Sequence, residues 1–174
     1  MASHRPALLR VTALLDHISL WTGRAVAFLV LPMVMGLVYE VVARYVFRAP
    51  TAWAYDVTFM LFGTYFMLGA AYTLMRKGHI RTDTFYGNWS PRTQGMVDAA
   101  GYVILIPALM IFFWIGWLYF ARSFAQGERI VTSPWMPIVY PFKFVIPLTA
   151  VMLILQSVSE LLKSVWAIRT GEWP

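Results

Sequence analysis

The most constraining feature of the sequence is a stretch of 19 residues without a charged side chain, residues 57–75, which lies between Asp56 and Arg76. A helix rises about 1.5 Å per residue, so roughly 20 apolar residues cross a hydrocarbon core about 30 Å thick. Charged residues gather at both ends of the stretch, where a spanning helix would meet water. This segment therefore predicts a transmembrane helix.

Three other segments have the same character, and the composition agrees with them. The predicted spans are approximately residues 25–43, 53–75, 98–121 and 142–162. Only 13% of the residues are charged, whereas a soluble domain carries about 25%. We therefore predict an all-α integral membrane protein with four transmembrane helices in a single domain, residues 1–174. So few residues lie outside the spans that a soluble catalytic domain has no room, and we do not expect an enzyme.

The N-terminal segment has an amphipathic pattern. Leu8, Val11, Leu15 and Ile18 recur at three- and four-residue spacing, which predicts a short amphipathic helix in the membrane interface before the first span. A frayed start of the first membrane helix is the alternative. Pro32 lies inside that first span and predicts a kink, which membrane helices tolerate.

The distribution of cations predicts the orientation. Of the 14 Lys and Arg residues, nine lie in the termini and the middle loop and the other five lie in the remaining two loops. Cytoplasmic loops carry the excess of Lys and Arg, so we expect both termini in the cytoplasm. This topology explains the net charge of +6, and we expect contact with membrane lipids and none with nucleic acid.

Several local pairs and caps can be predicted from spacing alone. Arg44 follows Glu40 by four residues, so the two side chains share a helix face and form an ion pair at the end of the first span. Thr51 is the expected N-cap of the second helix. Ser90 followed by Pro91 predicts the start of the third helix.

A set of charged and aromatic residues around the first two spans carries a family resemblance. Arg44 follows the first span, Asp56 follows Trp53 by three positions, and after the second span come His79, Arg81 and Asp83. In this order and spacing the chain resembles the small membrane subunit of tripartite ATP-independent periplasmic (TRAP) transporters, the DctQ-like family. That family more often has Glu at the position of Asp56. A proline-rich segment around Trp135, before the last span, also fits.

The resemblance implies the partners and the function. Such a subunit pairs with a large multi-span membrane subunit, which carries the substrate and sodium sites, in the bacterial inner membrane. A periplasmic binding protein delivers an organic acid to the complex. The small subunit is then a scaffold in a sodium-coupled importer, holds no cofactor itself, and helps to dock the binding protein through loops 44–52 and 122–141.

Two interpretations of the candidate residues stay open at each end of the second span. Arg44, Arg48, Trp53 and Asp56 form either a structural cluster that joins the first two helices or a docking patch, and we favour the cluster because charges at membrane depth seek partners. After the second span come His79, Arg81 and Asp83. These residues are either a contact for lipid headgroups and a partner subunit or a basic loop with a local ion pair. The segment around Trp135 is too apolar for water and lies on the membrane or against a partner.

Rival functions make different demands on the sequence. An autonomous proton-coupled exporter would use Glu40 as its membrane carboxylate, but Arg44 lies within reach of Glu40. A haem bundle needs histidines at membrane depth, and the three histidines lie outside the predicted spans. The chain has no cysteine, which excludes disulfides, thiolate catalysis and cysteine metal sites, and we expect no metal on this chain. The small subunit of another tripartite importer would lack the pattern from His79 to Asp83.

Overall fold

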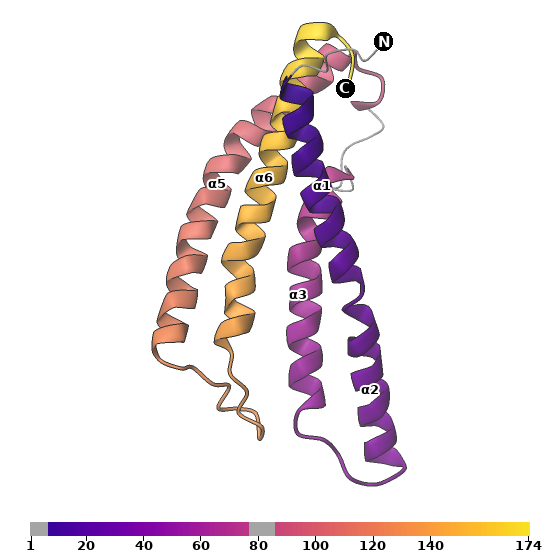
Figure 1. Ribbon diagram of the computed structural model, residues 1–174, viewed down its shortest axis with the longest axis vertical. Coiled ribbons are helices and arrows are strands. Elements are labelled where there is room, and N and C mark those ends of the chain that lie inside the picture. The colour runs from indigo at the N-terminus through magenta and orange to yellow at the C-terminus, as the bar shows by residue number, and fades with distance from the viewer. Residues whose placement is uncertain (1–6, 77–85) are drawn as a thin grey trace.

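The described part of the chain contains four helical segments that are long and apolar enough to cross a membrane. The structure is a computed structural model that describes residues 7–76 and 86–174. In order along the chain, the helices are α1 (Ala7–Ala27), α2 (Val30–Tyr45), α3 (Ala54–Met75), α5 (Pro91–Ala125) and α6 (Tyr140–Thr170). Helices α1 and α2 follow each other so closely that they form one apolar span, which brings the number of spans to four and confirms the predicted all-α membrane class (Figure 1).

Pro32 explains the break between α1 and α2. A proline has no N–H to donate, and its ring clashes with the carbonyl four residues earlier, which is that of Phe28. At this point the backbone changes to tighter bonds, from Phe28 N–H to the Ala25 carbonyl (3.2 Å) and from Leu29 N–H to the Val26 carbonyl (2.9 Å). The predicted kink is confirmed. The amphipathic N-terminal segment is therefore the first half of the first long helix, and it packs against α3 and α6.

The helix ends follow local sequence at some positions and tertiary contacts at others. The Ser90 side chain accepts a hydrogen bond from the Thr93 N–H, and Pro91 begins α5 as predicted. Gly171 takes a left-handed conformation (φ 81°) and ends α6, as glycine commonly does at this position. The prediction that Thr51 caps α3 is wrong, because Trp53 is the N-cap and has no side-chain bond there. Thr51 bonds instead to Glu40.

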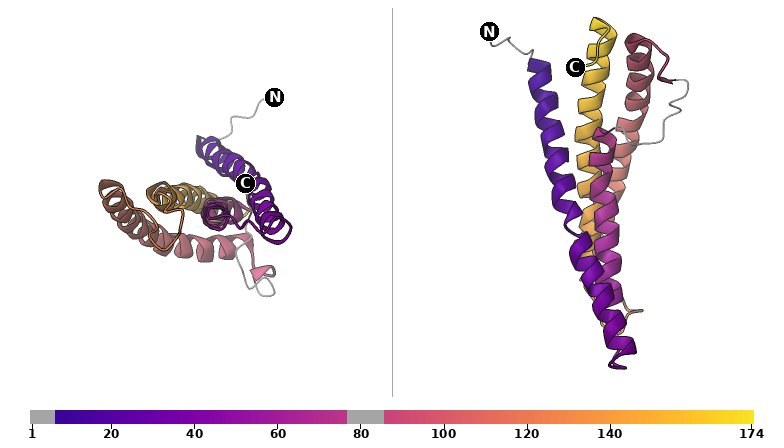
Figure 2. Two further views of the ribbon diagram at one scale, coloured as in Figure 1. Left: turned by 90° about the horizontal axis from the view of Figure 1, so that it is seen from below. Right: turned by 90° about the vertical axis from the view of Figure 1, so that its right-hand side faces the viewer.

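The helices stand side by side in an open row. Helix α6 contacts α1, α3 and α5, while α5 packs mainly on α6, and α2 packs on α3. Figure 2 shows this row from below, with α5 at one side and α2 at the other. Helix α6 is the central element, and it holds more buried residues than any other helix of the described chain. The outer helices leave large apolar side chains exposed, as a protein surrounded by lipid does.

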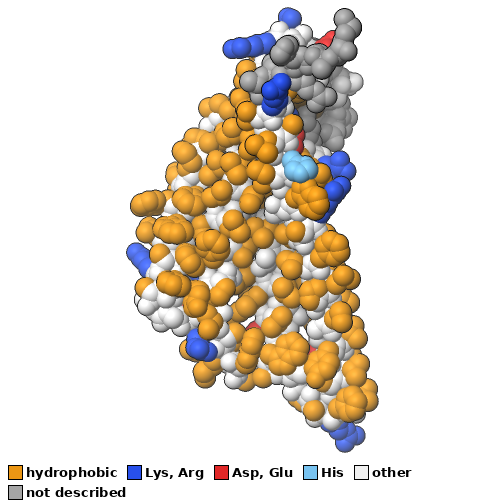
Figure 3. All heavy atoms as spheres, viewed as in Figure 1, with side chains coloured by type: hydrophobic (Ala, Val, Ile, Leu, Met, Phe, Trp, Pro, Cys, Tyr) orange, Lys and Arg blue, Asp and Glu red, His pale blue; other side chains and the backbone are white. Residues whose placement is uncertain are grey.

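The helices differ in length. Helix α3 has 22 residues, α6 has 31 and α5 has 35; at 1.5 Å per residue these correspond to about 33, 46 and 52 Å. Helices α1, α5 and α6 extend past α3 at the end where α1 begins and α6 ends (Figure 1). Figure 3 shows hydrophobic side chains over the middle of one face, with Lys and Arg side chains around its margins.

Candidate functional site

Glu40 closes the loop between α2 and α3. Its Oε1 accepts a hydrogen bond from Arg44 Nε (2.9 Å), so the predicted ion pair within α2 is present. Its Oε2 accepts the backbone N–H of Thr51 (2.9 Å) and also the Thr51 hydroxyl. Both carboxylate oxygens of Glu40 therefore face donors of this chain. A carboxylate engaged in this way fastens a turn and is poorly placed to carry protons across a membrane.

Trp53 and Arg48 lie near the loop between α2 and α3, whereas Asp56 bonds to a different part of the chain. Trp53 stacks on Tyr39 of α2, with ring centroids 5.8 Å apart, and so joins α2 and α3 beside the Glu40 turn. Arg48 lies exposed after α2 with a left-handed backbone (φ 53°). Asp56 takes no part in this turn, because its carboxylate accepts a hydrogen bond from Ser133 in the loop before α6. The structure thus gives Asp56 a partner distant in sequence.

That loop is a short, ordered hairpin, which we call the 128–139 hairpin. Arg129 and Ile138 form an antiparallel bridge. The Ile130 N–H donates to the Pro137 carbonyl (3.0 Å), and the Val139 N–H donates to the Glu128 carbonyl (3.1 Å). These backbone bonds hold the two arms together, so the proline-rich segment has a defined conformation.

An ion pair anchors the base of the hairpin to α6. Lys143 Nζ donates to Glu128 Oε2 (2.5 Å) and lies 3.9 Å from the centre of the Tyr119 ring on α5. The hydrogen bond from this ammonium group holds the pKa of the Glu128 carboxyl below its ordinary value of 4.5. The buried ammonium of Lys143 is thereby neutralised in the first turn of α6, where the helix dipole opposes a positive charge.

The tip of the hairpin holds Trp135 at the surface. The Trp135 N–H donates to Ser133 Oγ (3.2 Å), and the Ser133 hydroxyl in turn donates to Asp56 of α3. The Trp135 side chain is exposed, as are its neighbours Val131 and Met136. The apolar surface that the sequence predicted for this segment is therefore present, and a chain of hydrogen bonds fixes its position.

Sequence reasoning missed the largest buried polar cluster of the described residues, which joins α1 to α6. We call it the α1–α6 network; its members are Asp16, Ser19, Gln156, Ser159, Glu160 and Lys163. Lys163 Nζ donates to Asp16 Oδ2 and to Glu160 Oε1, each at 2.7 Å. Gln156 Nε2 donates to Asp16 Oδ1 (3.0 Å) and to Glu160 Oε1 (3.1 Å).

Two serines complete the α1–α6 network. Ser19 donates to Gln156 Oε1 (2.6 Å), and Ser159 donates to Asp16 Oδ1 (2.8 Å). Asp16 and Ser19 of α1 therefore bond to side chains of α6, and Glu160 bonds to Lys163 and Gln156 within α6. A signal was present in the sequence, since positions 156, 159, 160 and 163 share one helix face. The partner helix could not be read from that spacing, because α1 lies about 140 residues earlier in the chain.

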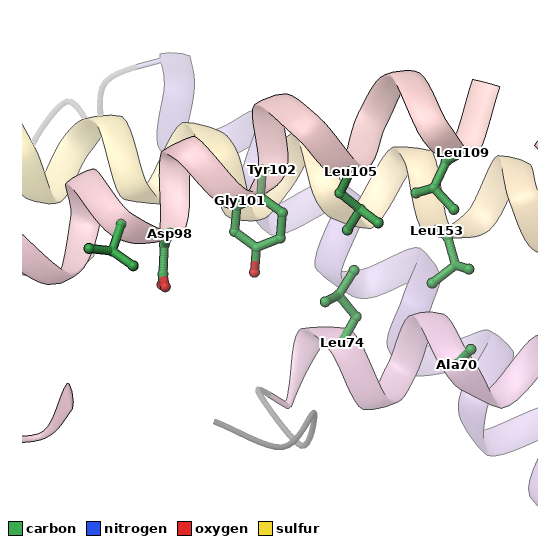
Figure 4. A pocket seen from close by; sticks show the side chains of 9 residues that line it. Ala70, Leu74, Asp98, Gly101, Tyr102, Leu105, Leu109 and Leu153 are labelled. Atoms are coloured by element: carbon green, nitrogen blue, oxygen red, sulfur yellow. The ribbon is translucent and has the colours of Figure 1, made fainter. Parts of the chain in front are cut away.

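A groove opens between α3 and α5, with α6 as its floor. Figure 4 shows Asp98 and Tyr102 of α5 at one end and Leu74 and Ala70 of α3 across from α5. Its volume is about 500 Å³, and its lining is mostly apolar. Asp98 accepts a hydrogen bond from the Tyr86 hydroxyl (2.8 Å). The groove can accept an apolar chain or a helix.

The histidines and the groupings of acidic side chains are the remaining candidates. Within residues 7–76 and 86–174, no group of three or more His, Asp or Glu side chains could hold a metal ion. His17, in α1, makes an edge contact with Trp21. His79, Arg81 and Asp83 lie outside the described residues, so the geometry of that predicted motif is not assigned.

The comparison with protein families agrees with this architecture. Residues 33–166 match the family described as "Tripartite ATP-independent periplasmic transporters, DctQ component", and this match covers more than half of the chain. No curated protein matches the chain. The matched region runs from the first span through the Glu40 turn and the 128–139 hairpin to α6. The chain therefore belongs to the DctQ family, the small membrane component of tripartite ATP-independent periplasmic transporters.

Proposed function

We propose that this chain is the scaffold subunit of a sodium-coupled importer of organic acids in the bacterial inner membrane. A large multi-span membrane subunit carries the substrate and the sodium ions, and a periplasmic binding protein delivers the substrate. The start of α1 and the end of α6 lie at the same end of the row of helices (Figure 1), and in this proposal that end and both termini are in the cytoplasm. The Glu40 turn and the 128–139 hairpin then face the periplasm, where the turn (residues 44–52) helps to dock the binding protein.

The observation that carries this proposal is the open row of helices in a chain of the DctQ family. Only α6 is largely enclosed, and the outer helices leave apolar faces free for a larger partner. Membrane helices associate by close packing of such faces. Glu40 and the charged members of the α1–α6 network are bonded to other groups of this chain, which supports a scaffold role over a transport path through it.

Co-purification tests the proposal. The chain is tagged, extracted in mild detergent, and its companions are identified by mass spectrometry. We expect one large multi-span protein in about equal amount. Recovery of the chain alone as a stable homodimer would contradict the proposal and favour an autonomous exporter.

Variants at the Glu40 turn refine this test. Arg44→Ala should reduce the yield of the complex more than it changes substrate preference, because it leaves Glu40 without its cation. Arg169→Ala, in an exposed position of α6 at the other end, is the matched control. Glu40→Gln tests the exporter alternative. If the chain is a scaffold, substrate uptake per assembled complex should be unchanged in this variant. If Glu40 couples proton movement to transport, the variant should lose transport.

A further inference from the structure

The 128–139 hairpin exposes four large apolar side chains at its surface. Its polar groups are engaged within the chain: Glu128 with Lys143, Ser133 with Asp56, and the Arg129 guanidinium with the Met136 carbonyl (3.1 Å). The exposed apolar side chains form what we call the hairpin apolar face, which consists of Val131, Trp135, Met136 and Ile138. Val131 is 78% exposed and Trp135 is 47% exposed. A loop in water shows the opposite distribution.

The hairpin apolar face is fixed in shape. The bridge between Arg129 and Ile138 pairs the arms, and the bond of Ser133 to Asp56 fastens the tip to α3. Met136 holds a left-handed backbone (φ 48°), which a residue with a side chain rarely adopts, and its N–H donates to the Ser133 carbonyl (3.1 Å). The face is therefore a preorganised surface that presents its side chains in one arrangement.

The depth of the hairpin follows from its contacts. The Ser133–Asp56 bond places the tip level with the first turn of α3, and Trp53, just before α3, stacks on Tyr39 of α2. Helix α2 continues for six residues beyond Tyr39 to Tyr45, which is about 9 Å. Val41, Val42 and Tyr45 on this extension are exposed and apolar or aromatic, so the bilayer reaches at least that far. The hairpin tip consequently lies inside that boundary (Figure 1).

The charges around the hairpin match phospholipid headgroups. The three acids at this end, Glu40, Asp56 and Glu128, all accept hydrogen bonds from the chain itself. Two cations here are exposed: Arg122, which precedes the hairpin, and Arg129, which lies in its first arm. Arginine binds phosphate with several parallel hydrogen bonds, and tryptophan prefers the boundary between headgroups and acyl chains.

We propose that the hairpin apolar face inserts into the headgroup region of the membrane, with Arg122 and Arg129 bound to lipid phosphates. The hairpin is then a lipid anchor that sets the depth of α5 and α6, which end short of α2 at this side. A docking role for a water-soluble protein belongs to the Glu40 turn, which lies further out. This inference concerns lipid and holds whichever partner the chain has.

Single cysteines test the proposal cleanly, because the chain has none of its own. Val131→Cys and Trp135→Cys variants of the full chain are spin-labelled in phospholipid nanodiscs, alone and with the co-purified large subunit. Accessibility is measured toward oxygen, which partitions into lipid, and toward a water-soluble nickel chelate. Glu172→Cys, in the exposed C-terminal tail, is the aqueous control, and the parent chain gives the background.

The expected result is a ratio of oxygen to nickel accessibility several-fold higher at positions 131 and 135 than at position 172. A ratio equal to that of the control would overturn the lipid anchor and leave the face free for a soluble protein. Protection from both reagents that appears only with the large subunit would also overturn it, in favour of a protein interface. If Trp135→Cys fails to fold, Val131→Cys and Ile138→Cys carry the test, because both side chains are exposed.

Discussion

Lys163 is the residue on which the α1–α6 network depends most, because it is the cation that bonds both Asp16 and Glu160. Lys163→Met leaves two carboxylates close together without a cation. Exposed ion pairs contribute at most about 1 kcal/mol, while breaking a buried pair costs about 3–5 kcal/mol. The Lys163 side chain is 16% exposed, so we expect a loss between these limits, about 2 kcal/mol.

Thermal unfolding of the purified chain in detergent checks this prediction. For a domain of this size, a loss of about 2 kcal/mol lowers the Tm by roughly 4–8 °C. Arg169→Met makes a similar change at an exposed position of the same helix and should leave the Tm unchanged. Equal melting of both variants would mean that the network contributes nothing to stability.

Glu128 gives the hairpin a dependence on pH. Its pKa in the folded protein is lowered by the hydrogen bond from Lys143, so the folded hairpin binds a proton less readily than the unfolded chain. The pair therefore stabilises the hairpin fully above the ordinary value of 4.5, and this contribution is lost as the pH falls further.

The measurement compares the wild type with Glu128→Gln, so that the titration of other groups cancels. The difference in Tm between the two proteins should be constant above the ordinary pKa of 4.5 and should shrink as the pH falls below that value. A difference in Tm that grows on acidification would contradict the prediction that the charged form of Glu128 stabilises the hairpin.

Pairs of residues close in sequence were predicted correctly, whereas pairs distant in sequence were not. The Glu40–Arg44 pair was predicted because both residues lie one turn apart on the same helix, where spacing determines the contact. Asp56 was expected near Arg44, yet it bonds to Ser133, 77 positions away. The same limit applies to Asp16 and Lys163. Local spacing carries no information about which distant segment a side chain will meet.

At the scale of the elements, glycines decide how closely α5 approaches α6. A Cβ added to Gly95 would lie 2.8 Å from the Ser164 carbonyl oxygen, and one added to Gly116 would lie 2.9 Å from Ile146 Cγ2. A Cβ at Gly101, in the same helix, would meet nothing within 4 Å. The three positions thus form a matched set in which only the packing differs.

Gly95→Ala should push α5 away from α6, because the backbone carbonyl of Ser164 cannot move as a flexible side chain can. Overpacking of this kind typically costs about 1–3 kcal/mol. Gly101→Ala should be neutral or stabilising, since alanine is the better helix former. Thermal unfolding and the yield of folded protein measure both variants, and a Gly95→Ala protein as stable as Gly101→Ala would refute the close contact.

The elements themselves were largely predictable, and α1 shows where the prediction stops. The apolar spacing of Leu8, Val11 and Ile18 predicted an amphipathic helix at the membrane interface. In the structure, Thr12 and Ser19 form the buried side of α1, while Val11 is exposed. In lipid, polar side chains find partners between helices and apolar ones face outward, so the buried face cannot be inferred from hydrophobicity alone.

At the scale of the whole molecule, the open row makes the stability of the chain depend on its surroundings. Helix α6 packs on three helices, whereas α2 and α5 each pack on little more than one neighbour. The apolar faces left over require lipid, detergent or a partner subunit. A large subunit that binds only the folded chain stabilises it by mass action, by about 2.7 kcal/mol when its concentration is 100 times the Kd.

We therefore expect the chain to melt several degrees higher in complex with its large subunit than alone in the same detergent. If the large subunit covers the outer helices as proposed, the gain should persist in Lys163→Met, whose defect lies between α1 and α6. A spectroscopic probe on this chain follows its melting separately from that of the partner. Identical melting of the free and the bound chain would mean that the open row of helices gains no stability from a partner. The scaffold interpretation would then lose its main physical support.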